Sequence, residues 1–376
     1  MKKLAKVLVT GGAGFIGSHV VDLLVKKGYD VRILDNLDPQ VHEESSRPNI
    51  NKKAEFVQGD ITKRKAWLNA LNDVDEIIHL AGVVGINQSM YQPVRYLNTN
   101  SLGIAVLYET LLKIPKLRKN IKKIIVASSK TIYGEGAYEC YKHGLVFPGI
   151  RPIKQLESGD WQVHCSNCNE NLKPVGVTEN KPPQNLSVYA LSKYDLERLS
   201  IMYGEAMDIP TIALRYFSAY GPRQSLSNPY SGVCAIFISR IINKKPPIIF
   251  EDGEQLRDFI YVEDIVRATV LALEKGRKSD CFNVGSGKPT SLNQLVEILK
   301  EILDNSIEPE FKNDFRMGDT RSDYADITKI RKELGFSPMI SLKNGLEKLT
   351  QWSSDKTAID RFEKSLVKNS VFRRVK

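Results

Sequence analysis

The sequence predicts an α/β protein: a Rossmann-type, doubly wound parallel sheet with a smaller, interleaved α/β substrate-binding domain. Three observations lead to this prediction: a strand, glycine turn and helix at the N-terminus, strands that alternate with helices up to about residue 216, and polar residues at the strand ends. The chain has 376 residues, 42% of them hydrophobic, which is enough for a sizeable core.

The N-terminal segment has the order of elements that dinucleotide binding requires. LAKVLVT at 4–10 reads as a strand, GGAGFIGSH follows it, and residues 18–27 are periodic as in a helix. Gly11, Gly14 and Gly17 allow a tight turn and bring a pyrophosphate close to the helix N-terminus. A second strand at 30–34 ends at Asp35, which would accept hydrogen bonds from ribose hydroxyls and repel a 2′-phosphate. We therefore expect NAD rather than NADP; the alternative is a glycine-rich turn with a capping aspartate.

Further strands are predicted at 54–57, 76–80, 123–127 and 211–214, and a long helix at 93–112. The carboxyl ends of parallel strands meet at one edge of the sheet, so we expect the residues at these ends to share a site: Asp35, Asp60, Ala81, Ser129 and Arg215. The predicted NAD-binding domain comprises residues 1–216 and about 245–285. The smaller domain comprises about 217–244 and 286–350, and a basic tail follows at about 351–376.

Tyr189 and Lys193, in SVYALSK, are four residues apart and so lie on one face of a helix. A lysine ammonium beside a phenol favours the phenolate, and we expect it to lower the pKa of Tyr189 and make it a general base. By itself the spacing is weak, because a solvated lysine beside a half-buried tyrosine gives the same pattern.

The chain carries 54 Lys and Arg against 44 Asp and Glu, a net charge of +10. An anionic diphosphate substrate or solvated surface lysines explain this balance better than nucleic acid, because basic and aromatic residues do not interleave. No run of eighteen apolar residues occurs, so we expect no membrane span, and we expect a cytoplasmic protein.

A series of ordered motifs resembles the extended short-chain dehydrogenases/reductases, in the branch of NAD-dependent nucleotide-sugar epimerases and dehydratases. The motifs are TGGAGFIGSH, GD at 59–60, HLAG at 79–82, SSKTIYG at 128–134, YALSK at 189–193, LRYFSAYGPRQ at 214–224, RDFIYVED at 257–264, FNVGSG at 282–287 and RMGDTRSDYAD at 316–326.

The resemblance implies catalysis by Ser129, Tyr189 and Lys193. It implies a cofactor site of Gly11, Gly14, Phe15, Ile16, Gly17, Asp35, Asn36, Asp60, Ile61, Leu80, Ala81, Gly82, Asn100, Tyr189 and Lys193. It implies a substrate site of Thr131, Ser218, Arg223, Arg257, Tyr261, Arg316 and Asp319, with Arg257 and Arg316 on the diphosphate. It further implies a homodimer through the helices near 93–112 and 187–207.

The two residues after Ser129 narrow the reaction that the resemblance implies. Sugar dehydratases carry an Asp-Glu pair there and decarboxylases usually a Glu, whereas this chain has Lys130 and Thr131. A 4-epimerase needs no added acid, so a nucleotide-sugar 4-epimerase is expected. A dehydratase, decarboxylase or reductase of the same family, or a catalytically silent NAD-binding module, are the alternatives.

An insertion at about 135–180 does not follow the common family pattern. It holds Cys140, His143, Cys165 and Cys168 as two pairs with two-residue gaps, the spacing of a zinc knuckle or ribbon. A structural zinc is expected, with reduced thiols or a single disulfide as alternatives. The insertion resembles the dTDP-L-rhamnose 4-epimerase group rather than most UDP-glucose 4-epimerases. Ser218 replaces a usual Asn, which leaves UDP-hexose and dTDP-6-deoxyhexose substrates both open.

Overall fold

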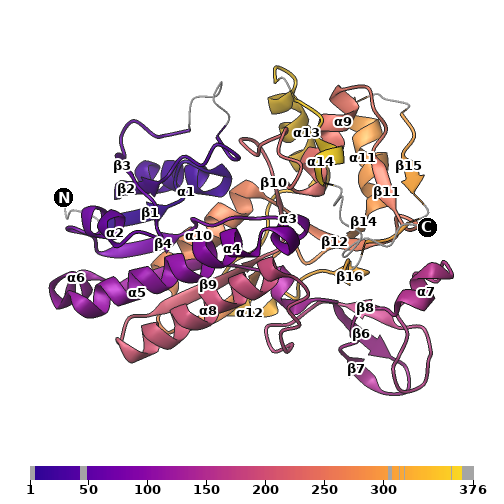
Figure 1. The fold of residues 1–376 in the computed structure, drawn as a ribbon, viewed down its shortest axis with the longest axis horizontal. Helices are drawn as coiled ribbons and strands as arrows, with labels where there is room; N and C mark the ends of the chain where they lie inside the picture. The colour runs from indigo at the N-terminus through magenta and orange to yellow at the C-terminus, as the bar shows by residue number, and fades with distance from the viewer. Residues whose placement is uncertain are drawn as a thin grey trace.

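The computed structural model describes residues 5–42, 49–303, 307–312, 314–316, 318–356 and 358–365. Its largest sheet is parallel, in the order β13-β9-β5-β4-β1-β2-β3, as the fold-class prediction required (Figure 1). The strand order reverses between β1 and β4, which is where ligands bind in such sheets. The strands are β1 (Lys6–Thr10), β2 (Asp30–Asp35), β3 (Glu55–Gln58), β4 (Glu76–His79), β5 (Lys123–Ser129), β9 (Thr211–Tyr216) and β13 (Asp280–Val284).

Helices cover both faces of this sheet. Alternate residues of β1 belong to two separate cores: Val7 and Val9 to one, Leu8 to the other. Burial on both faces explains why the strands read as continuous apolar runs rather than as alternating ones. The layer on the Leu8 side consists of α2 (Arg64–Ala70), α5 (Gly103–Lys113) and α8 (Val188–Ala206), and the opposite layer of α1 (Phe15–Lys26), α10 (Val262–Lys275) and α12 (Thr328–Leu334).

The helix predicted at 93–112 is interrupted. It consists of α4 (Pro93–Tyr96), a π-helical stretch η1 (Leu97–Leu102) and then α5. The wider π turn accommodates an extra residue, and such turns are frequent at functional sites. Here Asn100 is the buried side chain of the stretch. Two short helices flank the segment: α3 (Ile86–Tyr91) and α6 (Pro115–Asn120).

The smaller unit has a mixed sheet in which β12 pairs with β10, β14 and β16, and a second pair, β11 with β15. Residues 248–261, predicted to lie in the NAD-binding domain, form β11 and β12 and so belong to this unit. The sequence of a short apolar strand does not specify the strand with which it pairs. The elements are β10 (Ser218–Tyr220), β11 (Ile248–Phe250), β12 (Leu256–Tyr261), β14 (Pro289–Ser291), β15 (Glu310–Lys312), β16 (Ser322–Asp323), α9 (Val233–Ile242), α11 (Leu292–Leu303), α13 (Leu342–Ser353) and α14 (Phe362–Ser365).

The insertion forms its own small sheet, ordered β7-β6-β8, at one end of the molecule (Figure 1). It follows the short helix η2 (Lys130–Tyr133) and contains β6 (Ala137–Cys140), β7 (Gly144–Val146), α7 (Ile153–Glu157) and β8 (Lys173–Val175). Of the predicted basic tail, residues 366–376 lie outside the described residues. None of the helices in the described part of the chain is long and apolar enough to span a bilayer.

Candidate functional site

The glycine turn between β1 and α1 forms one end of a pocket. Gly11 has φ +69°, and a Cβ there would lie 2.7 Å from the backbone nitrogen of Ala81. A Cβ on Gly17 would lie only 2.0 Å from the carbonyl oxygen of Gly11. Both positions therefore require glycine, and the first turn of α1 lies directly against the end of β1. The positive end of this helix suits a phosphate group.

Asp35 lies at the end of β2, with its side chain fixed by the neighbouring backbone. Its Oδ2 accepts a hydrogen bond from Ala13 N at 3.0 Å, and its Oδ1 accepts one from Leu37 N at 2.9 Å. The carboxylate is only 8% exposed and lines the pocket beside Asn36. This is the position in which a carboxylate binds ribose hydroxyls and repels a 2′-phosphate.

A single cavity of about 620 Å³, called the central pocket below, joins most of the predicted residues. It extends from the glycine turn, past the ends of β4 and β5, to the smaller unit. Its lining includes Gly11, Gly14, Phe15, Ile16, Gly17, Asp35, Asn36, Asp60, Ile61, Leu80, Ala81, Gly82, Ser129, Thr131, Tyr189, Lys193, Ser218, Arg257, Arg316 and Asp319.

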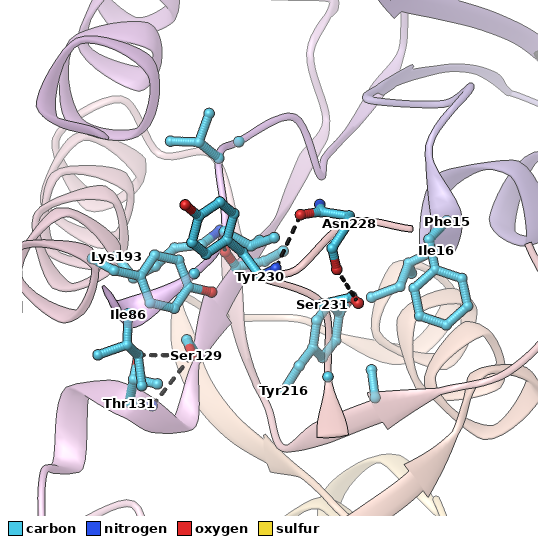
Figure 2. Close-up of a pocket in the computed structure, with 18 of the residues that line it drawn as sticks. Phe15, Ile16, Ile86, Ser129, Thr131, Lys193, Tyr216, Asn228, Tyr230 and Ser231 are labelled. Carbon is cyan, nitrogen blue, oxygen red and sulfur yellow. Dashed lines mark hydrogen bonds between the residues drawn. The ribbon is translucent and has the colours of Figure 1, made fainter. Parts of the chain in front are cut away.

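Ser129, Tyr189 and Lys193 meet in the middle of this pocket. Ser129 ends β5, and its Oγ accepts hydrogen bonds from the backbone and the hydroxyl of Thr131, at 3.2 and 2.9 Å (Figure 2). Tyr189 and Lys193 lie on the first turns of α8, which begins after Ser187; the Ser187 hydroxyl accepts from Ala190 N. The strand end and the helix start thus bring residues sixty positions apart together.

Burial affects the pKa values of both Tyr189 and Lys193. Lys193 donates to the carbonyl oxygen of Ala127 at 2.7 Å, and burial lowers its pKa to about 8. Burial raises the pKa of Tyr189, while a hydrogen bond with Ser129 acts in the opposite direction. Desolvation of the phenolate therefore acts on the Tyr189 pKa in the direction opposite to the effect expected from the Lys193 ammonium.

Asn100 lies behind the pocket rather than in its lining. Its Oδ1 accepts from Val83 N at 2.9 Å, and its Nδ2 donates to Ser192 Oγ at 2.9 Å and to Val83 O at 3.1 Å. The π turn of η1 places this amide between the loop after β4 and helix α8. Asn100 therefore holds the two walls together.

The opposite end of the pocket carries arginines. Arg316 binds the carboxylate of Asp319 through Nε at 2.7 Å and Nη2 at 2.6 Å, and lies 4.7 Å over the Phe250 ring. Arg257 donates to Thr320 O at 2.9 Å. Two guanidinium groups at one end of a cavity can bind a diphosphate bidentately.

Three residues expected at the site lie elsewhere. Arg223 pairs with Asp22 at 2.8 Å, and Tyr261 is buried with its ring against Tyr220, so neither lines the central pocket. Arg215 ends β9, but its side chain is buried in an ion pair with Glu197 of α8 at 2.5 Å. Position at a strand end does not determine which way a side chain points.

The pocket lining also includes residues to which the sequence analysis assigned no role. The loop 228–231 forms one wall of the pocket (Figure 2), and the Tyr230 hydroxyl forms a hydrogen bond with the Tyr91 hydroxyl. Asp323, in RSDYAD, lies opposite Lys130, whose ammonium is 2.5 Å from its Oδ2. Polarity alone did not distinguish Asp323 from its acidic neighbours in that motif.

Cys140, His143, Cys165 and Cys168 converge within the insertion, outside the central pocket. Their ligand atoms all lie within 4.8 Å of one another. The Sγ atoms of Cys140 and Cys165 are 3.4 and 3.5 Å from His143 Nδ1, and Cys140 Sγ is 3.7 Å from Cys168 Sγ. The cysteines are free, and 3.7 Å is far beyond a disulfide bond.

Comparison with known proteins agrees with this geometry. The dTDP-L-rhamnose 4-epimerase of Burkholderia thailandensis is 34% identical over 352 residues, covering 92% of this chain and 94% of the relative. The UDP-glucose 4-epimerase of Thermotoga maritima, solved with UDP-glucose, superposes with a TM-score of 0.75 at 34% identity, covering 92% of this chain and 98% of that one. The UDP-glucuronic acid 4-epimerase of Bacillus cereus, solved with UDP-glucuronic acid and NAD, gives 0.75 at 29% identity, with the same coverage.

The model of the NAD dependent epimerase/dehydratase family matches residues 7–145 and 167–285. The unmatched gap falls inside the Cys/His insertion, while the glycine turn, Ser129, Tyr189 and Lys193 all lie within the matched ranges. The chain belongs to the NAD dependent epimerase/dehydratase family.

Proposed function

We propose that this protein is an NAD-dependent 4-epimerase acting on a UDP- or dTDP-linked hexose through a transient 4-keto sugar. The observation that carries the proposal is the convergence of Ser129, Tyr189 and Lys193 between the dinucleotide-binding turn and the two arginines. NAD, when bound, supplies the hydride acceptor and donor. The relatives described above, which act on dTDP- and UDP-sugars, support both nucleotide classes.

In this mechanism the protein's own residues move the proton and hold the sugar. The Tyr189 side chain, as its phenolate, takes the proton from the sugar hydroxyl and becomes the phenol, and the Ser129 hydroxyl hydrogen-bonds the same sugar oxygen. Lys193, which donates a hydrogen bond to Ala127 O, supplies a positive charge that favours the phenolate form before the proton transfer. The 4-keto sugar then turns so that the opposite face of C4 meets the cofactor site, and the Tyr189 phenol returns the proton to the same sugar oxygen. We assign Arg257 and Arg316 to the diphosphate and Asp319 to the nucleoside end.

The surroundings of Ser129 disfavour elimination of water. Lys130 and Thr131 supply no acid, and the nearby Asp323 is already an acceptor: its Oδ2 receives bonds from Lys130 and from Thr320 Oγ1 at 2.9 Å. This oxygen of Asp323 is therefore already occupied by two hydrogen-bond donors within the protein. Oxidation and reduction at one carbon remain as the chemistry that the pocket supports.

Product analysis tests this proposal. We expect the purified protein, incubated with UDP-glucose, UDP-glucuronic acid, dTDP-L-rhamnose and GDP-mannose, to invert C4 of at least one UDP- or dTDP-sugar. The C4 hydride should be retained, with no net NADH at 340 nm and no loss of water or carbon dioxide. Stoichiometric NADH release, or a dehydrated or decarboxylated product, would assign the chain to another reaction of the family.

We propose that the Cys/His cluster binds a structural zinc ion. A tetrahedral zinc with Zn–S bonds of about 2.3 Å and Zn–N bonds of about 2.0 Å separates two sulfurs by about 3.8 Å and a sulfur from a nitrogen by about 3.5 Å. The separations of 3.7, 3.4 and 3.5 Å fit these values. Four protein ligands leave no open position, which indicates a structural role. Thiolate ligands persist in a reducing compartment, which supports a cytoplasmic location.

We also propose a homodimer formed through α5 and α8, which pack side by side. Both present apolar side chains to solvent: Leu112 is 44% exposed on α5, and Leu191 and Met202 are 43% and 50% exposed on α8. Light scattering should give twice the 42.4 kDa chain mass, and Leu191→Glu should shift the protein toward that of one chain. A wild-type protein that runs as a single chain at micromolar concentration would rule the dimer out.

A further inference from the structure

The Cys/His insertion lies along the segment 319–326, which contributes Asp319, Thr320 and Asp323 to the lining of the central pocket. Three hydrogen bonds join the insertion to the outer end of this segment. Two are between backbone groups, from Val177 N to Tyr324 O and from Asp326 N to Val177 O, and in the third the Tyr324 hydroxyl donates to Pro174 O. The insertion is therefore a support for a wall of the site as well as an appendage.

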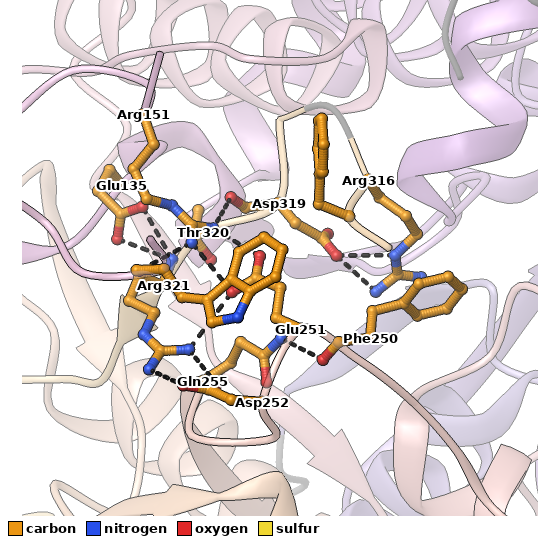
Figure 3. A network of polar contacts seen from close by, with 12 residues as sticks. Glu135, Arg151, Phe250, Glu251, Asp252, Gln255, Arg316, Asp319, Thr320 and Arg321 are labelled. Atoms are coloured by element: carbon orange, nitrogen blue, oxygen red, sulfur yellow. Dashed lines mark hydrogen bonds and ion pairs between the residues drawn. The ribbon is translucent and has the colours of Figure 1, made fainter. Parts of the chain in front are cut away.

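Arg151 makes several of the hydrogen bonds between the insertion and the rest of the protein. It lies before α7 in the insertion, and its side chain is 3% exposed. Its guanidinium donates to both oxygens of Glu251, at 2.8 and 2.9 Å, to Trp161 O at 3.0 Å and to Asp319 O at 3.2 Å (Figure 3). The buried guanidinium of Arg151 thus connects the insertion to Glu251 of the smaller unit and to the backbone of Asp319, which lines the pocket.

The contacts continue from Asp319 to the pocket. The Asp319 carboxylate receives both Nε and Nη2 of Arg316, and the Arg316 guanidinium lies over the Phe250 ring (Figure 3). On the other side, Trp161 of the insertion contacts the Phe315 ring, with centroids 6.4 Å apart. The insertion therefore contacts the chain before and after Arg316, at Phe315 and at Asp319.

A second connection comes from the base of the insertion. Glu135 accepts hydrogen bonds from the backbone nitrogens of Arg321 and Ser322, at 2.8 to 3.0 Å, and from the Tyr138 hydroxyl at 2.8 Å. The Tyr138 ring packs in the small core that also holds Cys140 and Cys165. The fold of the Cys/His module is thereby linked to the position of residues 319–322.

Arg151 itself does not line the central pocket. We infer that Arg151 is a positioning residue that holds Arg316 and Asp319 in place for the nucleoside diphosphate, so that the insertion sets nucleotide-sugar affinity without taking part in proton transfer. This inference rests on the proposed function, in which Arg316 and Asp319 bind the nucleotide end. It predicts that substitution of Arg151 weakens binding of the nucleotide sugar and leaves the rate of proton transfer at Tyr189 unchanged.

The test is Arg151→Met in the full-length protein. We expect the Kd for UDP and dTDP, measured by calorimetry, and the KM for the nucleotide sugar to rise about tenfold, because displaced binding groups lose much of their effect. The kcat should stay within about twofold, since Ser129, Tyr189 and Lys193 are unchanged. The amount of bound NAD should also be unchanged.

Lys142→Gln is the matched control, because it removes a positive charge from the same insertion at an exposed pair with Glu170. It should leave every one of these values unchanged. Arg151→Lys keeps the positive charge but loses the planar guanidinium donors, so it should show part of the wild-type nucleotide affinity. If Arg151→Met does not fold, the affinity of Arg151→Lys tests the inference. Unchanged nucleotide affinity in the folded Arg151 variant, or a fall in kcat at constant KM, would overturn the inference.

The binding measurement does not depend on turnover. If the wild-type protein binds UDP or dTDP but epimerises none of the sugars, the proposed function fails while the role of Arg151 in binding is still measured. If it epimerises a sugar and the Arg151 variants bind as the wild type does, the inference fails by itself.

Discussion

Tyr189→Phe is expected to lower kcat by about a thousandfold and to leave NAD bound. The substitution removes only the phenolic oxygen that takes the proton from the sugar in the proposed mechanism, and a positioned general base contributes about 10²–10⁴-fold. The ring keeps its place at the start of α8, so the glycine turn and Asp35 are undisturbed. Turnover should be followed by product analysis under saturating nucleotide sugar, and NAD should be quantified after denaturing the protein.

Tyr194→Phe is the matched control, because Tyr194 lies on the same helix and outside the lining of the central pocket. It should keep wild-type turnover. A Tyr189→Phe enzyme that retained more than a tenth of the wild-type kcat would remove Tyr189 from the role of base. Loss of NAD from that variant would instead show that the residue acts through cofactor binding.

The second large effect is expected from the Cys/His cluster. Wild-type protein should contain one zinc per chain by elemental analysis, and Cys165→Ser should lose it. The buried core of the module is small, with Tyr138, Cys140, Val163, Cys165 and Leu172 as its members, so the metal supplies much of its stability. Without zinc, limited proteolysis should cut between residues 140 and 170 while the Rossmann sheet stays intact.

Cys281→Ser provides the comparison for this experiment, since Cys281 lies on β13 and outside the cluster. It should retain zinc and resist proteolysis like the wild type. Wild-type protein purified without chelators and found to contain no metal would refute the zinc site. Equal protease resistance in Cys165→Ser would show that the module folds without it.

Local sequence was sufficient for the features that depend on residues close in the chain. The glycine spacing in GGAGFIG, the position of Asp35 after the second strand, and the four-residue interval from Tyr189 to Lys193 each follow from one turn or one helix. The Rossmann-type sheet followed from the alternation of strands and helices. These features are short-range, so backbone geometry and hydrophobic pattern specify them.

Side-chain direction and long-range pairing required the tertiary structure. The sequence placed Arg215, Arg223 and Tyr261 at the site, but the fold uses Arg215 and Arg223 in ion pairs and buries Tyr261. The strands within 248–261 pair inside the smaller unit. This pairing could not be read from the chain, because the sequence of a strand does not specify its partner. The spacing of the four Cys and His residues and the proposed Ser, Tyr and Lys triad were visible in the sequence. Only the fold showed that Arg151 connects the insertion to Asp319, because that contact joins residues 168 positions apart.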